Sequence, residues 1–238
     1  MSEVVDQVIS ELKSRANPRN VEGMARFGIS SENTLGISVT ELRKVAKRLG
    51  RDHSLALELW ATGIHEARIL AAIIDEPTEV TKGQMEGWAK DFDSWDVCDQ
   101  ATTCLFDRTP YAFETAVEWS SRDEEYVKRA GFAMMAGLAV HDKAAADDVF
   151  ISLLQHVKRE SLDDRRYVKK AVNWALRQIG KRNLRLNKEA IRVATEISEM
   201  DSRAARWIAS DALRELRSEA VQKRLRSKRP EAQPGRCP

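Results

Sequence analysis

The sequence predicts an all-α protein. Apolar residues recur along the chain at the i, i+3 and i+4 spacing of amphipathic helices. The residues that usually form strands, Val, Ile, Phe and Trp, follow the same spacing and do not alternate with polar residues. Several of the predicted helices also resemble one another, which indicates a repeat architecture.

The helices follow one another with short turns between them. The first helix stops at Pro18, and a brief second helix covers 21–27. Ser38 and Glu41 form a capping box at the start of the third helix, which ends at Gly50. Ten further helices are predicted at 52–62, 64–75, 81–91, 95–106, 110–120, 123–139, 144–158, 163–180, 187–198 and 201–217.

The repeat is visible in segments 65–72, 126–133 and 167–174, which share a cation at the fourth place with small or apolar residues after it. Aligned positions along the chain are spaced by about 30 to 40 residues, the period of helical-pair repeats. These positions are Arg68, Asp99, Arg129 and Lys170. Stacked pairs bury a continuous core, so the sequence predicts a HEAT-like superhelix (an α-solenoid). The second helix of each pair should line the concave face of the superhelix. Because the repeated cation lies on these helices, this face should form a basic groove.

Charge is divided unevenly between the two halves of the chain. Residues 1–125 hold 14 Lys and Arg against 23 Asp and Glu, whereas residues 126–238 hold 25 against 14. A basic half is the usual electrostatic signature of a polyanionic partner, although scattered cations also simply solvate helices. We expect one solenoid domain over 1–217 and a basic, disordered tail over 218–238.

Several classes of function lack their sequence signals. No apolar run is long enough for a membrane span and the N-terminus lacks a signal peptide, so we expect a soluble, cytoplasmic protein. The three cysteines, Cys98, Cys104 and Cys237, form no CxxC pair and are expected to be free thiols. HExxH, GxGxxG, P-loop and GxSxG motifs are absent from the sequence, so neither a metal nor a cofactor is expected.

An acidic and aromatic stretch near the middle of the chain is the first candidate site. Ser94 is a good N-cap, and the helix that follows places Trp95 and Asp99 one turn apart on a shared face. The apolar residues of this helix, beginning with Val97 and Cys98, gather on another face. An indole and a carboxylate are therefore held together outside the helix's own core. The alternative is that Asp99 caps or ion-pairs a neighbouring helix.

A cationic stripe on the predicted helix 163–180 is the second candidate site. Trp174 lies in the middle of this stripe, opposite the apolar face that contains Val172 and Ile179. Trp174 either packs against a neighbouring repeat or contacts a ligand among phosphate-binding cations. The stripe itself consists of Lys170, Trp174, Arg177 and Lys181, and the same charged region extends to Arg165, Arg166 and Arg182.

These residues resemble a known family, the AlkD-like DNA alkylation-repair proteins. The resemblance runs in order over about 5–217 and rests on Asn17-Pro18, 22–27, 94–99, 128–130 and 169–177. It implies a superhelix that holds duplex DNA in its concave face and hydrolyses the N-glycosidic bond of cationic N3- or N7-alkylated purines, without turning the base into a deep pocket.

The resemblance also implies roles for single residues. Asp99 would be the catalytic carboxylate, which stabilises the oxocarbenium-like transition state or orients water, and Trp95, Arg129 and Trp174 would complete the site. Phe27 stands where the family can carry a tyrosine, which leaves a stacking surface without a hydroxyl. The residues expected to bind DNA are Phe27, Lys128, Arg165, Arg166, Lys170, Arg177, Lys181 and Arg182.

Two other classes of function remain open from the sequence. One is a non-catalytic solenoid that binds bent or branched DNA and uses Asp99 structurally. The other is a protein scaffold that binds acidic peptides in its basic groove. For the glycosylase, we expect a monomer that is associated with the nucleoid when bound to DNA.

Overall fold

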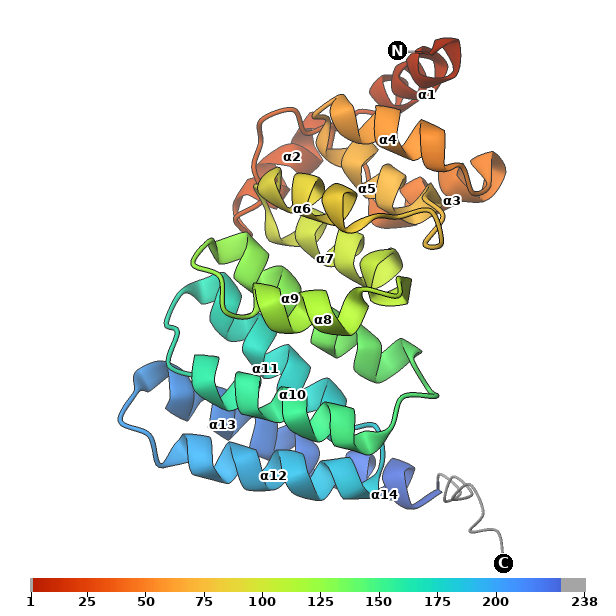
Figure 1. Ribbon diagram of the computed structural model, residues 1–238. Helices are drawn as coiled ribbons and strands as arrows, with labels where there is room; N and C mark the ends of the chain where they lie inside the picture. Colours follow the sequence, from red (N-terminus) through yellow and green to blue (C-terminus); the bar gives the residue numbers. More distant parts are fainter. Residues whose placement is uncertain (1, 228–238) are drawn as a thin grey trace, which may run out of the picture.

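A computed structural model describes residues 2–227, and within them the chain is a stack of helical pairs (Figure 1). The described residues contain no β-strand. The helices are α1 (Glu3–Ser14), α2 (Pro18–Ala25), α3 (Val39–Leu49), α4 (His53–Ala61), α5 (His65–Ile74), α6 (Lys82–Lys90), α7 (Trp95–Cys104), the 3₁₀ turn η1 (Phe106–Arg108), α8 (Ala112–Trp119), α9 (Glu125–His141), α10 (Asp147–Glu160), α11 (Arg166–Gly180), α12 (Leu184–Ser198), α13 (Arg203–Leu216) and α14 (Glu219–Ser227).

The pairs form two layers that run from the N-terminus to the C-terminus of the stack. In Figure 1, α4, α6, α8, α10 and α12 lie in the front layer, with α5, α7, α9, α11 and α13 behind them. Successive helices of the rear layer, α5 to α7, α7 to α9, α9 to α11 and α11 to α13, are packed against one another. We call this rear layer the second-helix layer. The predicted all-α repeat fold is thereby confirmed, and within residues 2–227 no helix has the length and apolar character needed to cross a bilayer.

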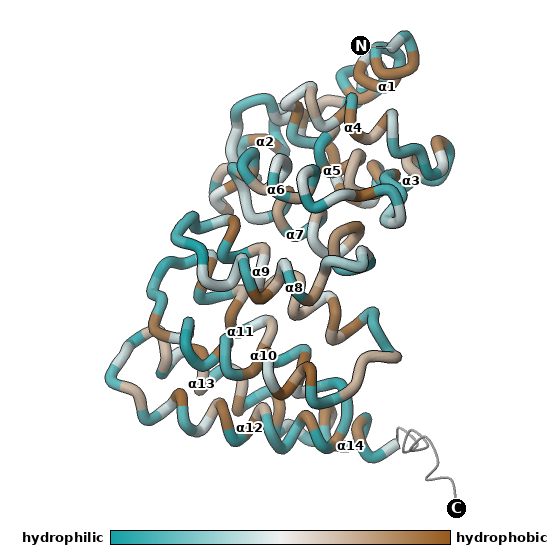
Figure 2. The backbone as a smooth tube through the Cα atoms, viewed as in Figure 1, coloured by the Kyte–Doolittle hydropathy of each residue, from teal (hydrophilic) through white to brown (hydrophobic). Residues whose placement is uncertain are grey.

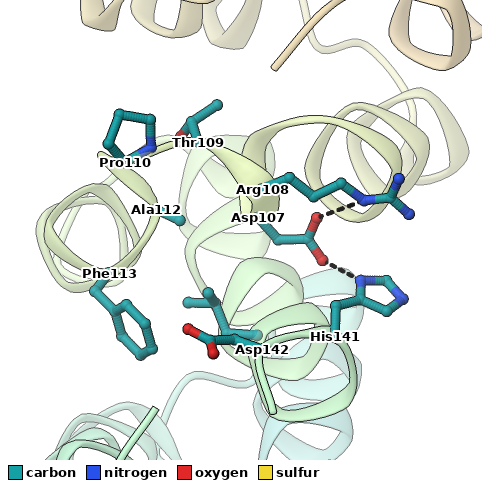
Figure 3. A pocket seen from close by; sticks show the side chains of 9 residues that line it. Asp107, Arg108, Thr109, Pro110, Ala112, Phe113, His141 and Asp142 are labelled. Atoms are coloured by element: carbon teal, nitrogen blue, oxygen red, sulfur yellow. Dashed lines mark hydrogen bonds and ion pairs between the residues drawn. The ribbon is translucent and has the colours of Figure 1, made fainter. Parts of the chain in front are cut away.

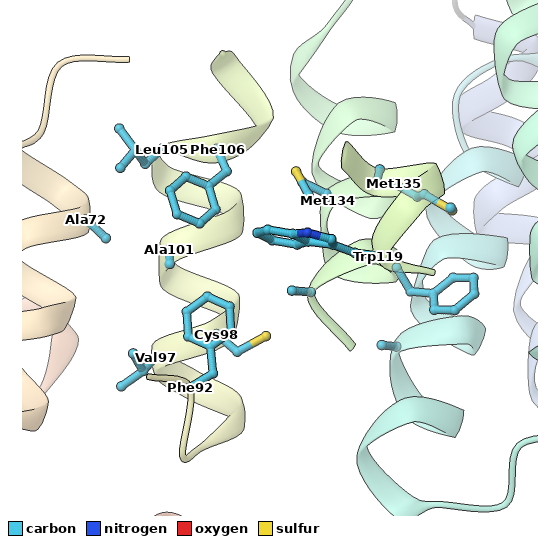
Figure 4. Close-up of a cluster of buried hydrophobic side chains, with 14 of the residues drawn as sticks. Ala72, Phe92, Val97, Cys98, Ala101, Leu105, Phe106, Trp119, Met134 and Met135 are labelled. Atoms are coloured by element: carbon cyan, nitrogen blue, oxygen red, sulfur yellow. The ribbon is translucent and has the colours of Figure 1, made fainter. Parts of the chain in front are cut away.

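The core is continuous between the two layers. Hydrophobic and hydrophilic residues alternate along the helices in Figure 2, and the buried hydrophobic residues form one cluster, as expected for amphipathic helices that cannot bury their apolar stripes alone. In the central repeats, Trp119 and Phe106 are fully buried and meet edge to face, with ring centroids 6.1 Å apart (Figure 4). Trp60 and Trp88 stack at 3.9 Å. The helical spacing of Trp60, Trp88 and Trp119 predicts core or repeat-junction positions, and their burial confirms this.

Polar contacts repeat with the same period as the helices. Many side-chain bonds join residues that are 30 to 38 positions apart, one repeat along the chain. Examples are His65–Asp96, Asp99–Arg129, Lys158–Glu196 and Asn173–Asp211. This ladder fixes the register of each repeat against the next, because each buried polar group needs its partner in the adjacent repeat.

Two sequence-based expectations need correction. Residues 219–227 form α14, which buries Val221 and Leu225, although a disordered tail is expected there. The rest of that predicted tail, 228–238, lies outside the described residues. The helical spacing of Trp207 predicts a core or repeat-junction position, but its side chain is 42% exposed.

Candidate nucleic-acid site

The first turn of α7 is fixed by contacts that the sequence does not reveal. Ser94 occupies the N-cap position, but its hydroxyl accepts no backbone N–H and is buried without a partner among the described residues. Instead, Asp96 in the first turn accepts a hydrogen bond from Nε2 of buried His65 on α5, at 2.9 Å. Burial lowers the pKa of His65, but Asp96 outweighs that effect and the pKa is raised above its ordinary value. This pair holds Trp95 and Asp99 in place on the second-helix layer.

Asp99 forms a two-pronged ion pair with Arg129 of α9. Nε of Arg129 donates to Oδ1 at 2.9 Å, and a terminal guanidinium nitrogen donates to Oδ2 at 2.7 Å. The side chain of Asp99 is 14% exposed and that of Arg129 is 7% exposed. Burial raises the pKa of the Asp99 carboxyl above its ordinary value, and the guanidinium opposes this rise. The carboxylate is thus held in one orientation, with a small part of its surface open to solvent.

Two aromatic rings and a loop surround this ion pair. The indole nitrogen of Trp95 donates to the carbonyl oxygen of Phe27 at 3.1 Å, and the Arg129 guanidinium lies 5.8 Å from the Trp95 ring centre. The other guanidinium nitrogen of Arg129 donates to the carbonyl of Tyr167 at 2.8 Å. The hydroxyl of Tyr167 lies 3.5 Å from the same Phe27 carbonyl. The loop after α2 therefore joins α7 and α11 across the site.

Gly28 is required for this closure. Its φ of +78° is in the left-handed region, and a Cβ at this position would lie 1.6 Å from the Tyr167 hydroxyl. Tyr167 is held from its other side by Tyr126, whose ring stacks on it with centroids 5.7 Å apart. The side chain of Phe27 is 65% exposed beside this loop, so it presents the open ring surface that the sequence predicts.

The structure brings Trp95, Asp99 and Arg129 together, but Trp174 is not part of this contact network. Trp174 is half-buried on α11, seven residues after Tyr167, which is two turns farther along the same face. Among the described residues, no hydrogen bond or ring contact joins Trp174 to Trp95, Asp99 or Arg129. Tyr167, which the sequence analysis does not single out, is the aromatic residue of α11 that contacts this network. The sequence signal that could have identified Tyr167 is its spacing of seven residues from Trp174, which places both side chains on one face of α11.

The predicted DNA-binding cations fall into three groups, of which the first is buried. Lys128 is 8% exposed and bonds to Glu160 at 2.8 Å, and Arg182 is 9% exposed and donates to the carbonyls of Asp142 and Ala145. The burial of these two side chains gives them structural roles, which argues against the predicted contact with DNA.

The cations of the second group form ion pairs near the surface, and those of the third group are exposed to solvent. Arg165 pairs with Asp163, while Arg177 and Lys181 both pair with Glu215 of α13. Those three cations lie on α11 or beside it but are largely neutralised. Arg166 and Lys170 are exposed and make no ion pair with any described residue.

A separate cavity of about 390 Å³ lies away from the ion pair, between η1, α8 and the end of α9 (Figure 3). Its buried carboxylate, Asp107, forms a hydrogen bond of 2.6 Å with Nδ1 of His141. Gly137 has no side chain, which leaves room for Asp107. Burial raises the pKa of Asp107 to about 6. A second cavity of about 240 Å³ includes Tyr126 in its lining. Asp99 lines neither of these cavities.

The fold and the site together define a helical-repeat protein with an aromatic-flanked carboxylate on its second-helix layer. Residues 8–216 match the family described as DNA alkylation repair enzyme, and this match spans most of the chain. The chain belongs to the DNA alkylation repair enzyme family.

One solved structure agrees with the fold, and two curated sequences are similar to part of the chain. A solved structure from a new family of proteins related to the HEAT-like repeat DNA glycosylases, with affinity for branched DNA structures, superposes with a TM-score of 0.76. The two chains are 21% identical, and the match covers 92% of this chain and 95% of the other. The uncharacterized proteins Lin0241 of Listeria innocua and Lmo0209 of Listeria monocytogenes are each 24% identical over 131 residues. Those matches cover 53% of this chain and 58% of each relative's length.

Proposed function

We propose that this protein is a DNA glycosylase that releases cationic N3- or N7-alkylated purines from duplex DNA. The observation that carries this proposal is the Asp99 carboxylate, which Arg129 fixes in one orientation beside Trp95 and which stays 14% exposed. The family match supports action on alkylated DNA. The protein would work as a monomer, because one chain supplies every group that the reaction requires.

The chemistry suits a site with so few ionisable groups. An alkylated purine is already positively charged, so the bond between C1′ and the base nitrogen breaks with both electrons leaving on a neutral base. Positive charge then grows on the deoxyribose, and the fixed Asp99 carboxylate stabilises it more strongly than mobile water does. Water adds its oxygen to C1′ and loses a proton, which leaves an abasic sugar. Asp99 lines neither cavity, which is consistent with a base that is not inserted into a deep pocket.

Arg129 and Trp95 have distinct roles in this proposal. Arg129 orients the carboxylate and opposes the rise in pKa that burial causes, so it favours the ionised form that the reaction needs. The indole face of Trp95 adds cation–π attraction to a positively charged sugar, worth about 1–2 kcal/mol. Trp95 is itself positioned by its bond to the Phe27 carbonyl.

The decisive experiment measures release of the alkylated base from methylated duplex DNA by Asp99→Asn. We expect base release to fall by about a hundredfold or more, because the fixed negative charge is lost, while DNA binding is retained. Asparagine cannot satisfy Arg129 as a carboxylate does, so this variant also loses stability, and the assay must be run below its unfolding temperature.

Glu160→Gln is the matched control for that loss of stability. Its side chain is 15% exposed and pairs with Lys128, one residue from Arg129, so the substitution damages a similarly buried pair outside the site. Glu160→Gln should keep base release. Equal losses in the two variants, or release at the wild-type rate by Asp99→Asn, would contradict the role of Asp99.

A second candidate function is non-catalytic binding of branched DNA. The relative with affinity for branched DNA favours it, as does the engagement of both Asp99 oxygens by Arg129. A wild-type protein that binds branched DNA but releases no alkylated base would establish this candidate and exclude the glycosylase.

A further inference from the structure

Trp207 is an exposed aromatic residue that the proposed glycosylase reaction does not use. It lies in the N-terminal half of α13, within the second-helix layer, and is 42% exposed. All six tryptophans of the chain lie in the described range, and the other five are buried or half-buried. Most exposed apolar side chains are smaller and scattered, so an indole left open on this layer requires an explanation.

One cation contacts this indole, and others lie on the same segments of α11 and α13. Nζ of Lys169 lies 5.6 Å from the centre of the Trp207 ring, within the range of a cation–π contact. Residues 166–176 of α11 and 203–210 of α13 contain five basic side chains and no acidic one. We call this group the Trp207 surface, and it consists of Arg166, Lys169, Lys170, Arg203, Arg206 and Trp207. Only Arg206 among these pairs with an acid, the fully exposed Asp201, in the described part of the chain.

The register of the two helices places these residues at one level of the stack. Lys169 contacts Trp207, Asn173 bonds to Asp211 and Arg177 bonds to Glu215, each pair 38 residues apart. The N-terminal halves of α11 and α13 therefore lie side by side. In their C-terminal halves, Asp211 and Glu215 neutralise the cations of α11, so the net positive charge is concentrated around Trp207.

This arrangement opposes the stability of the helices themselves. A helix N-terminus carries a partial positive charge and favours acidic side chains, yet both helices begin with arginine and have no acid in the first turn. Arg166 and Arg203 make no ion pair with any described residue that would offset this cost. The same positive charges favour a phosphate ligand. Local conflicts of this kind are expected at functional sites.

We propose that the Trp207 surface binds an unpaired base and its flanking phosphates, where duplex DNA opens into single strand. The bases of an intact duplex stack on one another, whereas an unpaired base is free to stack on the open indole. Aromatic stacking of this kind is largely independent of sequence, and the cations of the Trp207 surface bind the backbone on either side of the base. The inference rests on the DNA binding of the proposed function and adds a second contact on α11 and α13.

The test compares affinity for a forked DNA and for a blunt duplex of the same length, by fluorescence anisotropy at fixed salt. Trp207→Ala should weaken binding of the fork by about tenfold and change binding of the blunt duplex by less than about twofold. Trp207→Phe keeps a stacking ring and should bind the fork almost as the wild type does. Leu184→Ala is the matched control, because Leu184 is 43% exposed on α12 of the other layer, and it should change neither affinity.

Three results would overturn this inference. The first is an equal loss of affinity for the fork and the blunt duplex in Trp207→Ala, and the second is an unchanged affinity of this variant for the fork. The third is a wild-type protein that binds acidic peptides more tightly than either DNA. The proposed glycosylase activity is judged separately, by base release from methylated blunt duplex. Trp207→Ala should retain that release, so a failure of either proposal is distinguishable from a failure of the other.

Discussion

Arg129 of α9 holds both carboxylate oxygens of Asp99 on α7, and it binds the backbone of α11 at Tyr167 with its remaining nitrogen. One guanidinium thus connects three successive helices of the second-helix layer. Both members of the pair are largely buried, so removing one of them leaves the other charge without compensation. The pair is therefore both the centre of the candidate site and a structural joint of the solenoid.

The first prediction concerns the stability of this joint. Arg129→Gln should lower the free energy of unfolding by about 3–5 kcal/mol, because it leaves a buried carboxylate unpaired. Lys82→Gln is the control, since it breaks an exposed pair with Glu114 and should cost about 1 kcal/mol or less. Urea denaturation measures both. Arg129→Lys keeps the charge but loses the two-pronged geometry, so an intermediate loss is expected, and equal small losses in all three variants would contradict the structural role.

The second prediction separates the two aromatic residues of α11. Tyr167→Ala should reduce base release by about tenfold, because it removes the ring that packs between Tyr126 and the loop at Gly28. Trp174→Ala should reduce release less, since Trp174 lies two turns away. Single-turnover assays on methylated duplex DNA measure both effects. A larger loss with Trp174→Ala would restore the assignment made from the sequence.

The third prediction tests the close approach of Tyr167 to the loop after α2. Gly28 and Gly50 share a φ of +78°, but a Cβ at Gly50 meets no atom within 4 Å, whereas one at Gly28 meets the Tyr167 hydroxyl. Both substitutions by alanine carry backbone strain of about 1 kcal/mol, and Gly28→Ala should cost clearly more than Gly50→Ala. Thermal unfolding gives the difference. In a Tyr167→Ala background the two costs should become similar, and a persistent gap would show that the clash lies elsewhere.

The fourth prediction distinguishes open from buried cations. Lys170→Gln should weaken DNA binding and lower the slope of log affinity against log salt by about one, because an exposed lysine contacts phosphate. Lys188→Gln, at an exposed position on α12 of the other layer, should leave the slope unchanged. Titrations between low and moderate salt provide the slopes. A change with Lys188→Gln as large as that with Lys170→Gln would place the DNA on a different surface.

The fifth prediction follows from the raised pKa of Asp107. Its folded-state pKa of about 6 lies above the ordinary value of 3.8, so between these pH values the folded protein holds a proton that the unfolded chain has released. The contribution of Asp107 to stability is therefore complete below about pH 4 and is lost as the pH rises through 6. Asp107→Asn should remove this decline. Asp201→Asn, at a fully exposed position, serves as the control, and equal pH profiles for wild type and Asp107→Asn would refute the assignment.

Much of the local structure was predictable because it depends on short-range patterns. Helical spacing of apolar residues identified α1 to α13 to within a few residues at each end, and the Ser38 cap was correctly placed. The spacing of Trp95 and Asp99 placed them on a shared face of α7, but Asp99 is only 14% exposed because it is paired with Arg129. Ser94 was not correctly interpreted, because its hydroxyl is buried and the first turn is held by His65 from another repeat.

By itself the sequence determined the all-α class, the repeat period, the family resemblance and the helix that carries Asp99, since each of these follows from periodicity or from neighbouring residues. Only the tertiary structure decided which cationic side chains remain available to bind DNA. Lys128 and Arg182 became structural, Arg177 and Lys181 were paired with Glu215, and Trp207 stayed open beside Lys169. The physical reason is that these ion pairs and buried contacts join residues about one repeat apart in the sequence. Which residue becomes the partner of a given cation depends on how successive helices pack.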